Sequence, residues 1–464
     1  MNKTLRWISL LVFVLSHVPS VFAQGNLAPS AAPAPSMKTL SQVEPRTPIS
    51  SLPFAITAAG SYYLTTNLTG TASGGITISA GDVTVDLMGF ALVGGTGNGI
   101  FVSGARTNIA VRNGTVRGWS SYGMELFNAV NSQLENLTVS SNRFTGVAVG
   151  GGSMIKDCTI RGNGGSGIFA GTGSTVNDCS VIFNSTHGIN TGSGCSISGC
   201  NAAYNGENGI DVGESTTITS CNAYTNSGDG ILTSYSSVVS GSTASWNGGR
   251  GIQVGSGGIV SKCVSRSNGG DGIYALTGSS VSDSVSRDNS GRGIFCNTAG
   301  LVSRCVAVSN AGIGLQGDSA SVIADCTASF NDADGMLIGN GCTVTGSTVN
   351  SNFGDGIQAG SDCNVKDNNC DGNGNGGDGA GIHITGADTR VDSNNVNDND
   401  RGIDVDFGGN LIIRNSASGN TTDYEIAAAN KVGVIVDAPD SVAISGSTGG
   451  SGVGSTSPWA NISF

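Results

Sequence analysis

A repeat of 21 residues is the feature that most constrains how this chain folds. A Gly followed by an apolar residue begins each unit, and the pair recurs at this spacing from Gly146-Val147 to Gly356-Ile357. Three further columns keep the same register: Val or Ile at position 10, Cys or another small residue at position 13, and Asn at position 18. A fixed period of this length is typical of a solenoid, in which each repeat contacts only its neighbours.

Each unit contains three short stretches with the period of two that a strand requires. In residues 188–208, GINTGSGCSISGCNAAYNGEN, apolar or small residues stand at positions 2 and 4, 8 and 10, and 13 and 15. The Gly, Ser, Asn and Asp residues between them suit tight bends. The sequence therefore predicts an all-β fold, a single-stranded parallel β-helix of about 16 coils with mostly 21 residues per coil.

The columns also predict what fills the interior. Ile and Val at positions 2 and 10 are expected to stack into inner ribs. Asn at position 18 is expected to adopt the left-handed conformation at a turn and to form an asparagine ladder with its copies. Ten of the twelve cysteines lie at the inward positions 8 and 13. We expect buried free thiols there, with disulfides between adjacent coils as the alternative.

The two ends of the chain differ from the repeats. Residues 1–23 have the charged, apolar and small-residue regions of a secretory signal peptide, so we expect an extracellular, cell-surface or periplasmic protein. An Ala/Pro/Ser-rich stretch and longer coils of 23 or 24 residues follow. The predicted organisation is a signal peptide at 1–23, a linker at 24–51, an N-terminal cap at 52–74, the β-helix at 75–422, and a C-terminal cap and tail at 423–464.

Together with the Gly-Ile and Asn columns, three segments carry a resemblance to a known family. PFAITAAGSYYL, GITISAGDVTVDLMGF and the closing PWANISF resemble the ends of secreted bacterial right-handed parallel β-helix proteins, which share the pectate-lyase-like fold. The resemblance covers nearly all of the chain after residue 50 and implies right-handed coiling. It is weak for activity, because this fold hosts lyases, hydrolases, epimerases and proteins with no assigned reaction.

The charge balance limits the partners. Without Lys3 and Arg6 of the signal peptide, the chain has 19 basic and 33 acidic residues and a net charge near −14. This argues against nucleic acid and anionic membranes as partners. No later apolar run is long enough to span a membrane. A polysaccharide or cell-surface glycan is the expected partner.

Histidine limits the chemistry. Only His187 and His383 follow the signal peptide, about nine coils or roughly 40 Å apart, so a multi-histidine metal centre is excluded. Each is expected to be a solvated surface residue. The Asn-Thr-Asp, Asp-Asp and Gly-His-Gly signatures of the hydrolases in the resembled family are missing.

Charges alternate in sign along two columns, for example from Asp229 to Arg292 at position 21. The first interpretation is a ladder of ion pairs that keeps neighbouring coils in register. The alternative is a site for an anionic glycan on this part of the helix. Its candidate catalytic residues are Arg266, Arg287, Asp271 and Asp283.

The outward position 3 mixes aromatic residues with amides and carboxylates, which suits contact with sugar rings along a flat strand face; isolated surface aromatics are the alternative. The candidate carbohydrate-binding residues are Phe169, Asp211, Gln253, Tyr274, Phe295, Gln316 and Gln358.

Aspartates gather near the C-terminal end of the helix. Carboxylate oxygens are the ligands that Ca²⁺ prefers, and solvated acidic turns are the alternative. The candidate metal ligands are Asp398, Asp400, Asp404 and Asp406. No other cofactor is indicated.

Two functions remain open from the sequence. The regular coils favour an exported, non-catalytic polysaccharide-binding or surface scaffold module, because active sites tend to break local rules. The alternative is a polysaccharide lyase, hydrolase or epimerase that acts on an acidic glycan along one lateral face.

Overall fold

The structure is a computed structural model that describes residues 44–71, 74–374, 377, 379–437 and 457–464. The expected signal peptide and most of the expected linker lie outside these residues. The chain divides into two units, residues 1–46 and residues 47–464. In the described part of the first unit, Arg46 forms an ion pair with Glu44 at 2.7 Å. The second unit contains all the described strands.

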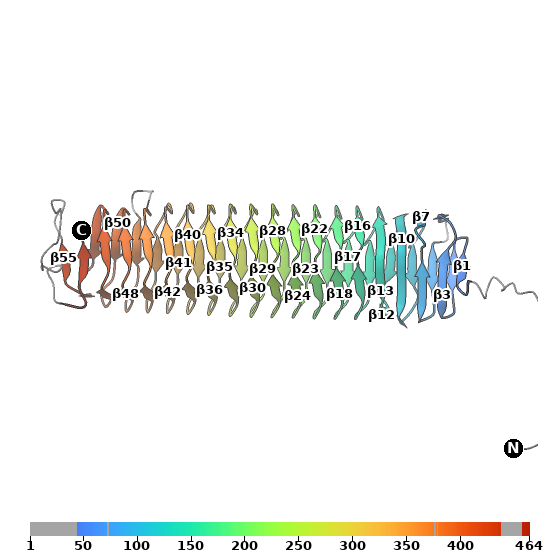
Figure 1. The fold of residues 1–464 in the computed structure, drawn as a ribbon, viewed down its shortest axis with the longest axis horizontal. Helices are drawn as coiled ribbons and strands as arrows, with labels where there is room; N and C mark the ends of the chain where they lie inside the picture. The colour runs from blue at the N-terminus through green and yellow to red at the C-terminus, as the bar shows by residue number, and fades with distance from the viewer. Residues whose placement is uncertain (1–43, 72–73, 375–376, 378, 438–456) are drawn as a thin grey trace, which may run out of the picture. The chain divides into compact units, whose positions relative to one another are not determined.

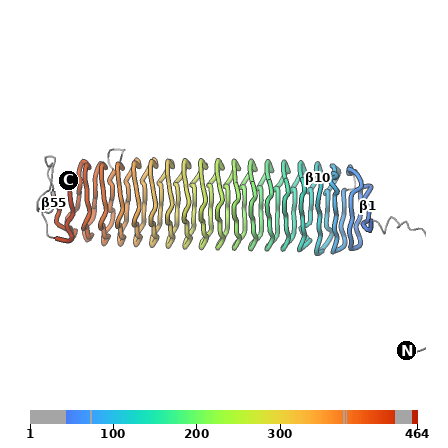
Figure 2. The backbone as a smooth tube through the Cα atoms, in the orientation of Figure 1, coloured from blue at the N-terminus to red at the C-terminus, as the bar shows by residue number. Residues whose placement is uncertain are grey.

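The second unit is a parallel β-helix, as predicted, and its described residues contain no helix (Figure 1). Each regular coil contributes three strands, for example β17 (Ile168–Ala170), β18 (Thr175–Asn177) and β19 (Ser180–Ile182). Each strand pairs in parallel with its copy one coil later, so that Ile168 lies beside Ile189 and Val176 beside Ile197. Successive coils therefore stack directly on one another (Figure 2).

The first strands of the coils form a parallel sheet of eighteen described strands, called here the first sheet. This number slightly exceeds the predicted 16 coils. The strands are β2 (Phe54–Ile56), β5 (Ile76–Ile78), β8 (Ile100–Val102), β11 (Met124–Leu126), β14 (Val147–Val149), β17, β20 (Ile189–Thr191), β23 (Ile210–Val212), β26 (Ile231–Thr233), β29 (Ile252–Val254), β32 (Ile273–Ala275), β35 (Ile294–Cys296), β38 (Leu315–Gly317), β41 (Met336–Ile338), β44 (Ile357–Ala359), β47 (Ala380–Ile384), β50 (Arg401–Val405) and β53 (Thr422–Ile426).

The second and third strands of each coil form two further ladders. Only two residues separate them in a regular coil, and in the longer early coils they merge into β10 (Ile109–Trp119) and β13 (Gln133–Ser140). Asp157, in the bend of the coil that follows, has a left-handed φ of 52°. This bend turns the chain between the second and third strands of the coil.

The interior is filled by the predicted columns. The Ile and Val side chains at positions 2 and 10 are buried, as Ile168 and Val176 show. All twelve cysteines are free and buried, which agrees with the expected free thiols. The Cys158 thiol donates to the Lys156 carbonyl oxygen at 3.1 Å. These cysteines therefore act as small core residues.

The asparagine ladder is confirmed and is buried. The Asn247 Nδ2 atom donates to Asn268 Oδ1 at 3.0 Å, and Asn247 Oδ1 accepts from the Asn226 backbone N–H at 3.0 Å. The expectation that these asparagines adopt the left-handed conformation is wrong. That conformation occurs at position 17, one residue earlier, as in Phe183 and Tyr204. Position 17 makes the turn, which leaves the Asn side chain to join the coils.

The glycine column has a steric cause. A Cβ atom on Gly230 would lie 2.6 Å from Asn247 Nδ2 and 2.6 Å from the Gly251 carbonyl oxygen. Contacts this short are sterically forbidden. Only glycine at position 1 therefore allows a coil to lie this close to the asparagine side chain and the glycine of the next coil.

The β-helix extends beyond both predicted boundaries. In the segment expected to form the N-terminal cap, β2 and β3 (Gly60–Leu64) pair with the next coil, and β1 (Thr47–Ile49) pairs with β3. At the other end, β56 (Asn461–Ser463) pairs with β52 (Ser416–Ser418). The terminal segments thus serve as coils themselves. The described residues form no helix long and apolar enough to cross a membrane.

Replacement of one ladder asparagine should destabilise the fold strongly. Asn247→Ala removes hydrogen bonds to Asn226, Asn268 and the Ala223 carbonyl oxygen and leaves buried polar groups unsatisfied, so we expect about 2–4 kcal/mol less stability. Asn247→Asp keeps the acceptor and should fall between wild type and Asn247→Ala. Urea unfolding followed by circular dichroism measures the differences.

The matched control is Asn222→Ala. Asn222 is exposed on a strand and donates to Asn201, so its loss should change stability by less than about 1 kcal/mol. Equal effects of Asn222→Ala and Asn247→Ala would contradict a special role for the buried ladder.

The thiols should be protected in the native protein. Ellman's reagent is expected to label few cysteines before unfolding and all twelve after unfolding in guanidinium without reductant. Fewer than about eight thiols in denaturant would show that disulfides bridge adjacent coils.

Candidate functional site

Strand register aligns the outward position 3 into one row along the first sheet. Phe169 lies beside Asn190, and Asn190 beside Asp211. The same pairing continues from Gln253 to His383. All seven candidate carbohydrate-binding residues belong to this row: Phe169, Asp211, Gln253, Tyr274, Phe295, Gln316 and Gln358.

A cleft of about 400 Å³ opens on the first sheet in the early coils. In the row, the small Ala148 stands between Glu125 and Phe169, so the sheet surface is hollowed at this point. Larger side chains rise on both sides. The residues that line this aromatic cleft are Tyr122, Glu125, Phe127, Thr145, Ala148, Ser166 and Phe169.

Aromatic pairs form the walls of the cleft. The Phe127 and Phe169 rings lie 5.4 Å apart, and Tyr122 packs edge-on against Phe144 at 5.8 Å. Phe127 leaves 55% of its surface exposed. Glu125 accepts a hydrogen bond from Asn98 Nδ2 at 2.5 Å, which orients its carboxylate. The cleft thus combines exposed ring surface with a few positioned polar groups, the composition of a small-molecule site.

The central aromatic residues of the row are covered by arginines. The Arg250 guanidinium lies 4.0 Å from the Tyr274 ring centre, and that of Arg292 lies 4.0 Å from the Phe295 ring centre. Phe295 is only 5% exposed. Arg292 also pairs with Asp271 at 2.9 Å. This arrangement supports the ion-ladder interpretation and leaves Phe295 with little surface for a sugar.

Other predicted carbohydrate-binding residues also have partners within the protein. Gln253 and Gln316 accept hydrogen bonds from Arg250 and Arg292, and Asp211 accepts one from Asn208. Gln358 lies beside His383 in the row. Phe169 is the one of the seven that lines the aromatic cleft.

The candidate catalytic residues lie on different stretches of the coil. Arg266 and Arg287 end adjacent third-ladder strands, and both face Asp288, at 3.4 Å and 4.0 Å. Asp283 lies in the bend between the second and third ladders and pairs with Arg304 at 2.7 Å. Asp271 instead precedes a strand of the first sheet. The structure does not gather the four into one site.

Three consecutive coils meet at His383. Its Nδ1 atom lies 2.8 Å from Asp355 Oδ2, and its Nε2 atom lies 3.1 Å from Asp406 Oδ2 and 3.8 Å from Asp404 Oδ2. The hydrogen bond to Asp355 raises the pKa of His383 to about 9, even though burial opposes the charge. The expectation of a solvated surface histidine is therefore wrong for His383, whose imidazole is largely enclosed.

The structure brings together two of the four candidate metal ligands. Asp404 and Asp406 place a carboxylate oxygen each within 4.8 Å of one another and of a His383 ring nitrogen. Asp398 is exposed in a bend, and neither Asp398 nor Asp400 belongs to this group.

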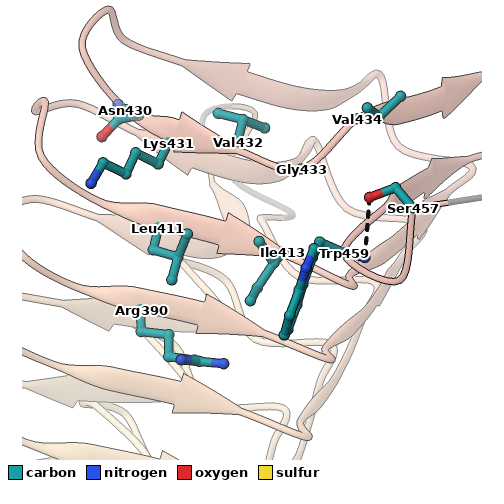
Figure 3. A pocket seen from close by; sticks show the side chains of 10 residues that line it. All are labelled: Arg390, Leu411, Ile413, Asn430, Lys431, Val432, Gly433, Val434, Ser457 and Trp459. Atoms are coloured by element: carbon teal, nitrogen blue, oxygen red, sulfur yellow. Dashed lines mark hydrogen bonds between the residues drawn. The ribbon is translucent and has the colours of Figure 1, made fainter.

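A second cavity, of about 740 Å³, lies at the last coils (Figure 3). Arg390, Leu411 and Lys431 line it from adjacent strands, and Trp459 forms another wall. Burial opposes ionisation of the neighbouring Asp392, but hydrogen bonds from Arg414 and Arg390 hold the pKa of that carboxyl well below its usual range. The charge of Arg390 is therefore balanced by the carboxylate of Asp392. Most of the other residues that line the cavity are apolar.

Sequence reasoning missed most of the aromatic cleft. Tyr122 and Phe127 line the cleft, and Phe144 packs against Tyr122. All three lie in turns beside the strands, so the position-3 row did not include them. The sequence did contain a signal, because these aromatic residues lie within two coils of Ala148, where the row has a small residue between Glu125 and Phe169.

Comparison with known proteins concerns the fold. The model of the family described as "Right handed beta helix region" matches residues 98–237, 189–320, 229–371 and 304–448. No curated protein matches the sequence.

Several solved structures are similar at low identity. The A-module of the mannuronan C-5 epimerase AlgE6 from Azotobacter vinelandii is 13% identical over 81% of this chain and 89% of its own, with a TM-score of 0.36. A tailspike protein of E. coli bacteriophage HK620 in complex with a pentasaccharide is 13% identical over 70% and 74%, with a TM-score of 0.36. Pectate lyase Pel9A is 14% identical over 55% and 69%, with a TM-score of 0.32. At these identities and TM-scores, the three likenesses carry no argument about what this chain does.

The charge on His383 should make stability depend on pH. Its folded pKa is raised to about 9, above the unfolded value of about 6.5, so its stabilising effect is complete below about 6.5 and is lost as the pH rises through 9. We expect His383→Gln to be less stable than wild type by roughly 1–3 kcal/mol at pH 6, and the gap to shrink by pH 9.5. Urea unfolding in EDTA tests this, and an equal gap at both pH values would contradict it.

Proposed function

The chain belongs to the family of right-handed beta helix regions, and from this premise we propose that it is an exported, non-catalytic protein that binds a neutral polysaccharide in the aromatic cleft. Export rests on the signal-peptide pattern of residues 1–23. Binding rests on one observation, the hollow that Ala148 leaves between aromatic walls on the first sheet.

The cleft suits the chemistry of a sugar ring. A ring exposes an apolar face of C–H groups and a rim of hydroxyls. Phe127 and Phe169 supply apolar ring surface, and Glu125, Thr145 and Ser166 supply hydrogen-bonding groups. A few polar groups among aromatic walls give orientation and specificity. The first sheet continues on both sides of the cleft, so a long chain can follow the strand face.

The charge of the cleft favours a neutral glycan. Glu125 is the only charged residue that lines it. A uronate carboxylate would face Glu125 without a lining Arg or Lys to neutralise it. The proposed ligand class is therefore a polysaccharide with hydroxyl groups rather than carboxylates.

The same residues favour binding without cleavage. Glycosidases use two carboxyl groups across the scissile bond, and the lining of the cleft offers only Glu125. His383 is another candidate for acid–base catalysis on the described first sheet, but both of its ring nitrogens already face carboxylates. A lyase, hydrolase or epimerase is the alternative function. A lyase or hydrolase would release soluble products from the same glycans, whereas an epimerase would change the configuration of the sugar rings without cleaving the chain.

The binding test uses the full chain with cellulose, xylan and galactomannan against polygalacturonate and alginate. We expect retention by at least one neutral glycan in co-sedimentation or affinity electrophoresis, without new oligosaccharides by mass spectrometry. Released products would identify an enzyme, and retention by acidic glycans alone would contradict the charge argument.

Two variants locate the site. Phe127→Ala removes a wall, and Ala148→Leu fills the hollow, so each should weaken binding about tenfold or more, since losing the stacking surface costs roughly 1–3 kcal/mol. Phe330→Ala is the matched control, because Phe330 is 58% exposed in a turn of a distant coil. Unchanged binding by both cleft variants would place the glycan elsewhere.

A further inference from the structure

The His383 cluster arises where two strands of the first sheet run side by side. Register places His383 on β47 directly beside Asp404 on β50, and Asp406 follows two residues later. Both carboxylates point to the same ring nitrogen, with Asp406 Oδ2 at 3.1 Å and Asp404 Oδ2 at 3.8 Å from Nε2. Three potential ligand atoms thus converge from two coils.

A third coil orients the imidazole. Asp355 Oδ2 lies 2.8 Å from Nδ1, on the far side of the ring, and Asp355 Oδ1 accepts the Ala380 backbone N–H at 2.7 Å. With Nδ1–H donating to Asp355, loss of the Nε2 proton, which is shared with Asp406 at 3.1 Å, would leave the Nε2 lone pair for a metal. Carboxylate–histidine pairs do this in many metal sites and also make the imidazole a stronger ligand.

The two separations from Nε2 are close to those between ligand atoms around a bound ion. Ligands at 2.0–2.2 Å around a tetrahedral ion are roughly 3.3–3.6 Å apart. The two distances from Nε2 lie on either side of this interval. An imidazole ligand favours zinc and its transition-metal neighbours, whereas Ca²⁺ and Mg²⁺ prefer oxygen ligands only.

Charge and burial also favour a cation. The carboxylates of Asp355, Asp404, Asp406 and Glu425 surround two described positive side chains, His383 and Arg401. Asp404 is 4% exposed, and Arg401 Nη1 lies 2.8 Å from its Oδ2 in an ion pair. That Oδ2 is buried, and among the described residues its contact with Arg401 is an ion pair without the geometry of a hydrogen bond. A divalent ion would reduce the excess of negative charge.

The other histidine shows that carboxylate neighbours alone are not enough. His187 lies 3.0 Å from Glu207 through Nε2 and 3.7 Å from Asp211 through Nδ1. Its two carboxylates therefore stand on opposite sides of the ring and offer no shared point for an ion. At His383, two carboxylates share one nitrogen and a third fixes the other.

We infer that His383, Asp404 and Asp406 form a binding site for a divalent transition-metal ion of the zinc type, with Asp355 as the residue that positions the imidazole. Asp406 is 48% exposed and provides the open side through which an ion can enter. The ion replaces the Nε2 proton, so binding releases a proton. The site is independent of the aromatic cleft and does not rest on the proposed function.

The test is a calorimetric titration of the full chain with ZnCl₂ at about pH 8, where proton competition is weaker. We expect one equivalent to bind. His383→Ala should abolish binding, and Asp355→Asn should weaken it by about 10–100-fold. Asp406→Asn alters an exposed side chain, so it should remain folded and should weaken binding at least tenfold. His187→Ala is the matched control and should bind like wild type.

Co²⁺ spectroscopy and a CaCl₂ titration complete the test. Co²⁺ should give visible bands of nitrogen and oxygen ligands without a thiolate charge-transfer band, and Ca²⁺ should bind more weakly than Zn²⁺. A thiolate band would assign the ion to the cysteines and overturn the inference. Unchanged binding in His383→Ala and Asp406→Asn, equal losses in His187→Ala, or tighter binding of Ca²⁺ would also overturn it.

Discussion

The hydrogen bond from one ladder asparagine to the next is the interaction on which the rest of this fold depends. Each side-chain oxygen accepts from the backbone and from the amide of the preceding coil, as Asn268 does for Asn247 at 3.0 Å in both cases. The backbone N–H at position 18, just after the turn, is buried away from water and donates to the side chain of the next asparagine, as in Asn247. The asparagine side chain supplies these hydrogen bonds, and the glycine at position 1 leaves the space that this side chain occupies. Coil stacking, strand register and the alignment of surface rows all follow from this contact.

The sequence predicted the fold well because every coil repeats the same physical solution. Glycine at position 1, an apolar residue at position 2 and Asn at position 18 each mark a contact with the adjacent coil, so eleven units carry the same three signals. Strand pairing continues past the boundaries predicted for the β-helix. Strands β1, β3 and β56 complete coils with sequences that lack the repeat, since an end coil has a neighbour on one side only. The left-handed residue was misplaced by one position because residues such as Phe183 and Tyr204 are unusual in that conformation.

The candidate sites were harder to predict because they arise where a column is interrupted. Ala148 matters through the larger residues beside it, and Tyr122 and Phe127 reach the cleft from turns that the strand pattern does not describe. The position-3 row did place His383 beside Asp404. Asp355 belongs to the preceding coil and lies 28 residues away because of the longer turn between them, so a spacing of 21 did not bring the two together. Electrostatic contacts between columns require the three-dimensional coil.

The constant register of the first sheet also fixes the distances between surface sites along the β-helix. Ten strand pairings separate Phe169 in the aromatic cleft from His383, and each advances the chain by about 4.8 Å. The two surfaces therefore face the same direction at a distance of roughly 50 Å, set by the number of units between them. Gain or loss of one whole repeat between them would change that distance by one step and leave the residues of both surfaces in place. In such a protein, length along the axis is a trait that duplication can alter without redesigning a single contact.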